Sequence, residues 1–281
     1  AVFKMTYRLI CDSCTDLPSE TLCDPHLVKI PLSIQVGPAT VLDDESFSQP
    51  ELLQKMRAWP DAPKTACPAP SQYMDQFRED KDNYIVTLSA RLSGSYNAAM
   101  QARAIYREEG GKANVHVFNS RSAVSGQAQA ALLIRELAGG GAPFAQVVER
   151  VEAFIARMQT LFVLENLDNL RKNGRLTKMQ SLVTGALRVK LLCGATREGE
   201  IEKLGQGLSV RQTLSKMVSR MAGDPDHAGR RLILAHCNCP ERAEAVRDMV
   251  RQRCRFGEVL IVPAGGIATV YANDGGIVAA D

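Results

Sequence analysis

The chain has 281 residues, of which 45% are hydrophobic and 23% charged, and its 34 basic and 31 acidic side chains leave a net charge of +3. This length predicts two domains or one large one, and the near balance of charge excludes a general electrostatic attraction to nucleic acid or to a membrane surface. No apolar run approaches the ~18 residues that a membrane span needs, and the N-terminus lacks the pattern of a secretion signal. We therefore expect a cytoplasmic protein without stable membrane insertion. In that compartment its cysteines would be thiols.

The first part of the chain alternates predicted strands with predicted helices. Short runs rich in β-branched and aromatic residues predict strands, and longer runs of helix formers with capping residues predict helices. The predicted strands are 7–11, 28–36, 84–88 and 115–118, and the predicted helices are 48–59, 71–78, 96–109, 125–137 and 143–158. This alternation is typical of a parallel α/β sheet, in which ligands bind at the carboxyl ends of the strands.

Polar residues lie in the loops of this predicted sheet. Residues 12–18 follow the first strand, Asn119 follows the fourth, and Thr65 belongs to a proline-rich link at 64–70. The prolines exclude a helix or a central strand in that link. Together with the turn around Ser93, we expect these segments to converge at one edge of the sheet.

The stretch from 84 to 101 contains the most informative of these turns. A strand leads into small residues, among them Ser93, Gly94 and Ser95, and a helix follows directly. The free N–H groups and the positive end of the helix dipole make such a turn a candidate anion site. An ordinary serine cap is the alternative, and it is favoured when the turn is considered alone.

A different pattern begins near residue 160. The predicted strands are 161–164, 188–195, 200–204, 231–236 and 258–262, and the predicted helices are 167–172, 179–187, 208–221 and 240–253. The glycine turn at 197–199 predicts an antiparallel hairpin. We therefore predict an N-terminal α/β domain at residues 1–159 and a C-terminal α+β domain at residues 160–281.

Familiar catalytic and metal-binding motifs are missing from the sequence. It contains no G-x-S-x-G elbow, no Walker A loop and no H-x-x-x-H pair. Cys11 and Cys14 follow a predicted strand as C-D-S-C, which leaves a thiol redox or metal protein as one alternative. No further ligand has the spacing of a zinc site, so we predict no catalytic residue, metal or cofactor.

Five motifs resemble, in order and across nearly the whole chain, those of the DegV family of fatty-acid-binding proteins. Residues 12–18 resemble its D-S-x-x-D-L-P, and residues 65–70 resemble its T-S-x-P-x-P link, with Ala66 and Cys67 as departures. The other three are L-S-G-S-Y-N-A-A at 92–99, a Ser/Gly loop at 120–126 and L-R-K-N-G-R-L at 170–176.

The resemblance implies a two-domain fold with a lipid tunnel between the domains, and a carrier rather than an enzyme. It implies that a single long-chain fatty acid is the ligand, with Thr65 and Ser93 holding the carboxylate and the N–H of Gly94 or Ser95 assisting. It also implies a separate fatty acid kinase as partner. We expect the turn with Arg175 to contact that partner; the alternative is that its cations only complement a helix dipole.

One segment departs from the family pattern. The family usually ends with a G-T-H-x-G-P-G-A run whose histidine reaches the lipid head, and the corresponding piece here is 268–275, with Val270 at the position of the histidine. Tyr271 is the other candidate for a head-group hydroxyl, but the alternation of a strand would point it to the opposite side. A neutral-lipid or regulatory binder is therefore a further alternative.

Overall fold

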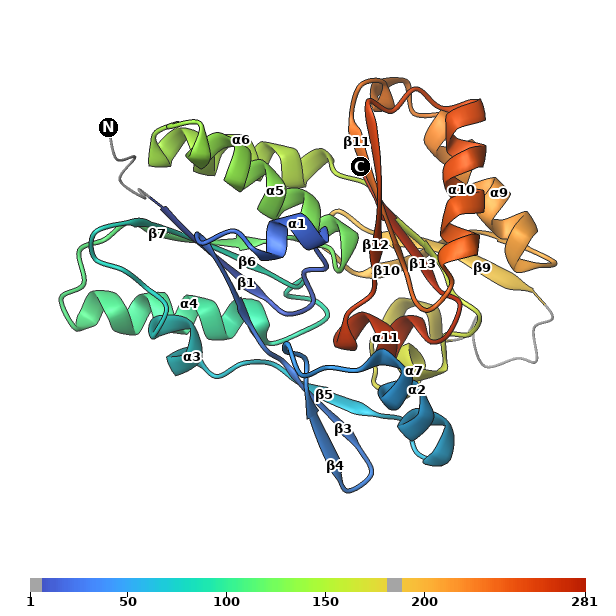
Figure 1. Cartoon of the computed structure of the whole chain (residues 1–281), viewed down its shortest axis with the longest axis horizontal. Helices are drawn as coiled ribbons and strands as arrows, with labels where there is room; N and C mark the ends of the chain where they lie inside the picture. The colour runs from blue at the N-terminus through green and yellow to red at the C-terminus, as the bar shows by residue number, and fades with distance from the viewer. Residues whose placement is uncertain (1–6, 181–188) are drawn as a thin grey trace.

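The computed structural model describes residues 7–180 and 189–281, which form three β-sheets with helices packed around them (Figure 1). Most of the helix predicted at 179–187 lies outside the described residues; a short 3₁₀ turn, η1, covers Thr177–Met179. The other elements are described sheet by sheet below, because the candidate site lies where the sheets meet.

The first sheet is parallel, as predicted. Its strand order is β2-β1-β6-β7, with β1 at Tyr7–Asp12, β2 at Leu27–Ile30, β6 at Asp82–Thr87 and β7 at Val115–Asn119. The helices α3 (Pro70–Met74) and α4 (Ser95–Glu108) cover one face, and α5 (Ser125–Gly139) and α6 (Phe144–Arg157) cover the other (Figure 1). The short helix α1 is Ser19–Leu22.

Alternation along the strands divides the core of this sheet. Ile10 and Ile85 pack with α3 and α4, whereas Leu9, Tyr84 and Val86 pack with α5 and α6. Successive side chains of a strand point to opposite faces, so strands that are apolar throughout require helices on both faces.

The single strand predicted at 28–36 is wrong. The chain turns at Pro31, and the segment divides into β2 and β3 (Ser33–Val36), which belong to different sheets. With β4 (Ala39–Leu42) and β5 (Lys64–Ala66), β3 forms a small antiparallel sheet in the order β4-β3-β5. The proline-rich link thus supplies an edge strand, the position that a neighbouring proline allows. Helix α2, Gln49–Ala58, connects β4 to β5.

The second large sheet is mixed and begins with β8. Its order is β10-β9-β8-β13-β11-β12, with β8 at Thr160–Val163, β9 at Lys190–Ala195, β10 at Ile201–Gly207, β11 at Arg231–His236, β12 at Glu258–Pro263 and β13 at Ile277–Ala280. The predicted hairpin is confirmed as β9 and β10, whereas β13 was not predicted. Helices α9 (Val210–Ala222) and α10 (Pro240–Arg253) cover the outer face, and the 3₁₀ turn η2 is Pro225–His227.

Two short helices lie beside the small sheet (Figure 1): α7, Asp168–Lys172, and α11, Gly266–Ala272. The strand assumed around Tyr271 is therefore wrong. Contacts from distant segments fix this helix, since α11 packs against α2, α7 and β3. Tertiary contacts of this kind override local preference in short segments.

Helix α5 is shared by the two large sheets, because it contacts β1 and β6 of the first and β11 and β13 of the second. The second sheet begins at Thr160, but the division at 159/160 into two domains remains a prediction.

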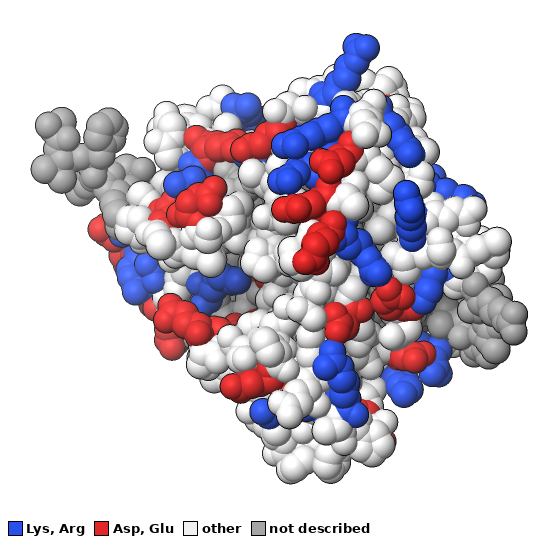
Figure 2. All heavy atoms as spheres, turned by 45° about the vertical axis from the view of Figure 1, so that its right-hand side comes forward, with Lys and Arg blue, Asp and Glu red and all other residues white. Residues whose placement is uncertain are grey.

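Charge is distributed without a dominant sign. On the face shown in Figure 2, basic and acidic side chains are interspersed. Within residues 7–180 and 189–281, no helix combines the length and the apolar character that crossing a membrane would require.

Candidate functional site

A cavity lies between the first sheet, the second sheet and α11, with about 860 Å³ of space that includes its open mouth. The wall is almost entirely apolar; its larger members are Leu88, Leu92, Phe162, Leu164, Ile201 and Val278. Such a lining suits a hydrocarbon chain rather than a polar metabolite.

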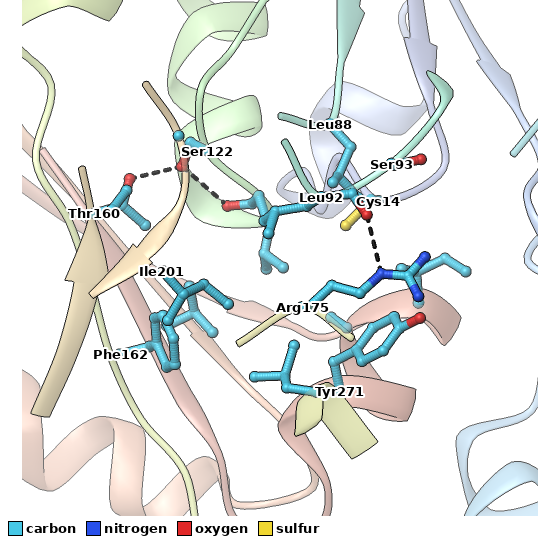
Figure 3. A pocket seen from close by; sticks show the side chains of 18 of the residues that line it. Cys14, Leu88, Leu92, Ser93, Ser122, Thr160, Phe162, Arg175, Ile201 and Tyr271 are labelled. Carbon is cyan, nitrogen blue, oxygen red and sulfur yellow. Dashed lines mark hydrogen bonds between the residues drawn. The ribbon is translucent and has the colours of Figure 1, made fainter. Parts of the chain in front are cut away.

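Polar groups gather at one end of this cavity. Thr65, Ser93 and Tyr271 are all on the wall, and the Thr65 Oγ1 lies 2.6 Å from the Tyr271 hydroxyl. The Arg175 guanidinium lies beside them (Figure 3), with its Cζ 5.9 Å from the centroid of the Tyr271 ring. Its Nε donates to the carbonyl of Leu92, 3.1 Å away. Three hydroxyls and one cation therefore surround this end of the cavity.

The position of Arg175 differs from the surface site expected for it. Gly174 ends α7 with a φ of +74°, and the chain then carries Arg175 back to the cavity, where it is half-buried. A positive φ is the reason for glycine at this turn. Contact of Arg175 with a partner protein remains a prediction. The structure places the Arg175 side chain on the wall of the cavity.

The buried carboxylate of Asp12 accepts hydrogen bonds from both sides of the turn with Ser93. Asp12 Oδ2 accepts from the N–H of Leu88 at 2.7 Å and from the Ser95 hydroxyl at 2.6 Å, while Oδ1 accepts from the Gln127 amide at 2.8 Å. Burial raises the pKa of Asp12 and outweighs the lowering by these hydrogen bonds. Asp12 thus fixes the turn without itself lining the cavity.

Ser95 is committed to this network. Its hydroxyl contacts Asp12 and, at 2.5 Å, the hydroxyl of Tyr73, and its N–H donates to Ser93 Oγ at 3.2 Å. Among the described residues, the cavity wall includes neither Gly94 nor Ser95. The assistance predicted from their N–H groups therefore remains a prediction, and the Ser95 hydroxyl is not available to a ligand.

The segments with Thr65 and Ser93 are close neighbours. A Cβ placed on Gly94 would lie 3.0 Å from the Sγ of Cys67, two residues beyond Thr65. The loops after β6 and β7 also meet, because the Asn119 side chain accepts from the N–H of Ala90 at 3.1 Å. The predicted convergence of polar loops at the carboxyl edge of the parallel sheet is confirmed.

Helix α11 reverses the expected roles of Val270 and Tyr271. Val270 is fully buried and is not among the wall residues described, whereas Tyr271 faces the cavity (Figure 3). Neighbouring helical residues point about 100° apart, and here Val270 points into the core while Tyr271 points to the cavity. Of these two residues, Tyr271 is the one on the cavity wall, and its role toward a ligand remains a prediction.

Two further hydroxyls line the wall away from Arg175. Ser122 Oγ lies 2.6 Å from Thr160 Oγ1, and Figure 3 shows this pair on the opposite side of the cavity from Arg175 and Tyr271. Since they bond to each other, they do not require a polar ligand.

Cys11 and Cys14 do not have the character of redox thiols. Burial raises the pKa of Cys11 to about 12 and the pKa of Cys14 well above its ordinary value. Reactive thiols have lowered pKa values, so this geometry counts against the redox alternative. No group of three or more histidine, cysteine or acidic side chains that could hold a metal occurs among residues 7–180 and 189–281.

Comparison with protein families gives one match over nearly the whole chain. Residues 6–280 match the family model DegV, described as "Uncharacterised protein, DegV family". A relative from Streptococcus pneumoniae, DegV domain-containing protein spr0652, is 32% identical over 280 residues, which cover 97% of this chain and 98% of the relative.

Solved structures show the same similarity in three dimensions. A DegV-family protein from Ruminococcus gnavus, refined with vaccenic acid, is 42% identical with a TM-score of 0.95 and covers 99% of this chain and 100% of its own. The Fatty Acid Kinase (Fak) B3 protein of S. pneumoniae, loaded with linoleic acid, is 29% identical with a TM-score of 0.88, over 98% of each chain. A DegV-family protein from Eubacterium eligens, loaded with heptadecanoic acid, is 26% identical with a TM-score of 0.89, over 98% of this chain and 99% of its own.

Proposed function

The chain belongs to the DegV family, and from this membership and its cavity we propose that it is a carrier of one long-chain fatty acid. The acyl chain lies in the apolar cavity between the sheets, and Thr65 and Ser93 hold the carboxylate. The observation that carries the proposal is a largely apolar wall with Thr65, Tyr271 and the Arg175 guanidinium side by side on it. The wall also includes Arg121, Ser122, Thr160 and Glu200.

The energetics of fatty-acid binding agree with a cavity that has an apolar wall and a polar end. Burial of methylene groups contributes about 0.8 kcal/mol each, so a C16 tail contributes roughly 10 kcal/mol before ordering costs. A carboxylate leaving water needs charge-assisted hydrogen bonds in compensation. The polar end supplies these bonds, and the apolar wall supplies the burial.

The Thr65–Tyr271 hydrogen bond prepares the site for an anion. When the Tyr271 hydroxyl donates to Thr65 Oγ1, the Thr65 proton is free to donate to the carboxylate. Ser93 supplies a second hydroxyl donor, and the Arg175 cation adds electrostatic attraction at the same end. A neutral lipid would use the hydroxyls but gain little from the cation, so the site favours an acid.

The proposed carrier presents its fatty acid to a separate kinase in the cytoplasm and does not itself catalyse a reaction. The basis is the similarity to the Fatty Acid Kinase B3 protein and the lack of a nucleotide-binding motif in this sequence. Arg175, at the polar end, is the residue that we expect to lie nearest to a docked kinase.

Extraction of the purified protein with organic solvent, followed by mass spectrometry, tests the carrier proposal. We expect fatty acid at up to one molecule per chain, and its chain length and unsaturation from the same spectra. An empty protein that also fails to bind added palmitate or oleate would refute the proposal.

A further inference from the structure

Two buried carboxylates hold the first turn of α11. The N–H of Gly265 donates to Asp16 Oδ2 at 3.0 Å, and the N–H groups of Gly266 and Ile267 donate to the two oxygens of Asp43 at 2.8 and 3.2 Å. Asp16 is 4% exposed and Asp43 is 7% exposed. These contacts join residues more than two hundred positions apart in sequence, and we call them the α11 clasp.

The clasp has a very close approach of backbone to carboxylate. A Cβ on Gly265 would lie 2.6 Å from Asp16 Oδ1, and a Cβ on Gly266 would lie 2.7 Å from Asp43 Oδ1. Any side chain larger than hydrogen at either position would displace α11 or the carboxylate. The two glycines are therefore part of the clasp.

A third tie acts on the middle of the same helix. The Gln49 amide donates to Thr269 Oγ1 at 3.0 Å and to the carbonyl of Ala264 at 3.3 Å. The Asn169 amide donates to the carbonyl of Val270 at 2.7 Å, and the Tyr271 hydroxyl then meets Thr65. Tyr271 lies about one helical turn beyond Ile267, so a displacement of the first turn would also move the Tyr271 hydroxyl.

We propose that Asp43, assisted by Asp16, is a positioning residue for the head-group site: it holds α11 so that the Tyr271 hydroxyl meets Thr65. This inference rests on the proposed fatty-acid function. It states how the Tyr271 hydroxyl is kept in hydrogen-bond contact with Thr65. Asp43 touches neither the cavity nor the ligand, and its effect passes through Tyr271.

Burial of the two clasp carboxylates is electrostatically unfavourable. The pKa of Asp16 is raised to about 7, mainly by burial; Asp43 and Asp12 also raise it, whereas Lys29 and the N–H of Gly265 lower it. Burial also raises the pKa of Asp43. Placing two carboxylates together out of water is unfavourable, and the backbone N–H groups of α11 are the compensation that both receive.

A double-mutant cycle tests the coupling. Oleate affinity is measured for the wild type, Asp43→Asn, Tyr271→Phe and the double variant. Asparagine keeps one acceptor but presents a donor to an N–H, so we expect Asp43→Asn to weaken oleate binding roughly tenfold, as Tyr271→Phe does. In the Tyr271→Phe background, we expect Asp43→Asn to change affinity by less than about twofold. An equal loss in both backgrounds would overturn the proposal.

Two further variants guard against a trivial loss of structure. Gly266→Ala retains both carboxylates but displaces the helix, so it should weaken oleate binding like Asp43→Asn. Asp24→Asn is the matched control, because Asp24 is a largely buried carboxylate that bonds to His26 and Arg135 and not to α11. It should leave oleate affinity unchanged; a loss equal to that of Asp43→Asn would contradict a specific role for the clasp.

Amide hydrogen exchange of the ligand-free protein separates this inference from the carrier proposal. We expect Asp43→Asn to speed exchange in 266–272 at least tenfold while α5 exchanges as in the wild type. If that change occurs but no variant, wild type included, binds oleate, the clasp stands and the ligand assignment fails. If oleate binds and 266–272 exchanges as in the wild type, the clasp proposal fails.

Discussion

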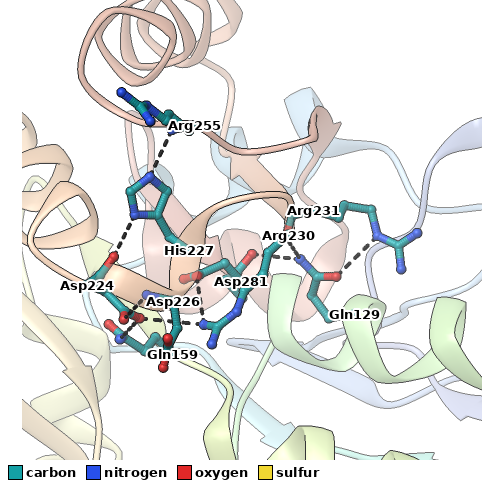
Figure 4. A network of polar contacts seen from close by, with 10 residues as sticks. Gln129, Gln159, Asp224, Asp226, His227, Arg230, Arg231, Arg255 and Asp281 are labelled. Atoms are coloured by element: carbon teal, nitrogen blue, oxygen red, sulfur yellow. Dashed lines mark hydrogen bonds and ion pairs between the residues drawn. The ribbon is translucent and has the colours of Figure 1, made fainter.

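Two of the contacts between the large sheets use different chemistry. At α5, the inner contacts are neutral: the Gln129 amide donates to the carbonyls of Arg231 and Ala280, both at 2.8 Å, and the Ser125 hydroxyl donates to the carbonyl of Val278 at 2.8 Å (Figure 4 shows Gln129). An ion pair between Glu136 and Arg231 lies at the exposed edge of this contact. At the α11 clasp, ionisable carboxylates accept from backbone N–H groups.

This contrast separates stability from function. Among the described residues, the α5 contact has no buried carboxylate and no side chain at the polar end of the cavity, so it holds the sheets together whether or not a ligand is bound. The clasp lies on the segment that carries Tyr271, and it contains groups with strongly shifted pKa values. Damage at α5 should therefore appear as lost stability, and damage at the clasp as lost affinity.

The largest effect is expected at the two residues that we propose as hydrogen-bond donors to the fatty-acid carboxylate. Each hydrogen bond to a charged group contributes about 1.5–3 kcal/mol, so Thr65→Val with Ser93→Ala should weaken oleate binding by about 3–6 kcal/mol. Calorimetric titration with oleate and with the matching fatty alcohol measures this. The alcohol should lose much less affinity than the acid, and the melting temperature of the empty protein should hardly change.

Equal losses for acid and alcohol would show that the site does not recognise a carboxylate. The neutral-lipid alternative would then be the better account of the Thr65–Tyr271 pair.

The next effect is the pH dependence that Asp16 of the clasp should contribute. The pKa of Asp16 is about 7 in the folded protein, against about 3.9 in an unfolded chain. Between these values the folded state binds more protons, so the free energy of unfolding falls as the pH rises from about 4 to about 7. Asp16→Asn should remove this contribution, which is at most about 4 kcal/mol.

Urea denaturation of the wild type and Asp16→Asn at several pH values between about 4 and 8 measures this contribution. Parallel curves for the two proteins would show that Asp16 does not titrate in this range.

A third prediction concerns the α5 contact. Gln129→Leu leaves two buried carbonyls and Arg231 Nε without this partner, and we expect a loss of about 2–3 kcal/mol in the free energy of unfolding. Oleate affinity, measured where the variant is fully folded, should match that of the wild type. A loss of oleate affinity at an unchanged free energy of unfolding would contradict the assignment of stability to the α5 contact and of affinity to the α11 clasp.

The smallest effect is expected at Tyr271. The phenylalanine variant keeps the ring and its contact with Arg175 but loses the hydroxyl at Thr65, so oleate binding should weaken by about 1–1.5 kcal/mol. The alcohol titration serves again as the control. Unchanged oleate affinity would show that Tyr271 only packs against the ligand.

Local patterns predicted most of the fold. Apolar strands such as 84–88 and the glycine turn at 197–199 carry their information within a few residues, and the parallel sheet and the hairpin follow from them. The segment 28–36 failed because Pro31 separates two strands of similar composition, and their assignment to different sheets depends on distant partners.

The polar end of the cavity was only partly predictable. Thr65 and Ser93 came from motifs that resemble a family, and the structure places both on the cavity wall. The position of Tyr271 could not be predicted, because α11 is a helix held by carboxylates that are more than two hundred residues away. Asp16 stood in a recognised motif, but no local signal indicated that its partner would be Gly265.

A crystal structure with bound oleate tests the central claim most directly. The account predicts the carboxylate within hydrogen-bond distance of Thr65 Oγ1 and Ser93 Oγ, with the tail running toward Phe162 and Ile201. A carboxylate bound instead at the Ser122–Thr160 pair, with the tail directed toward Arg175, would contradict it.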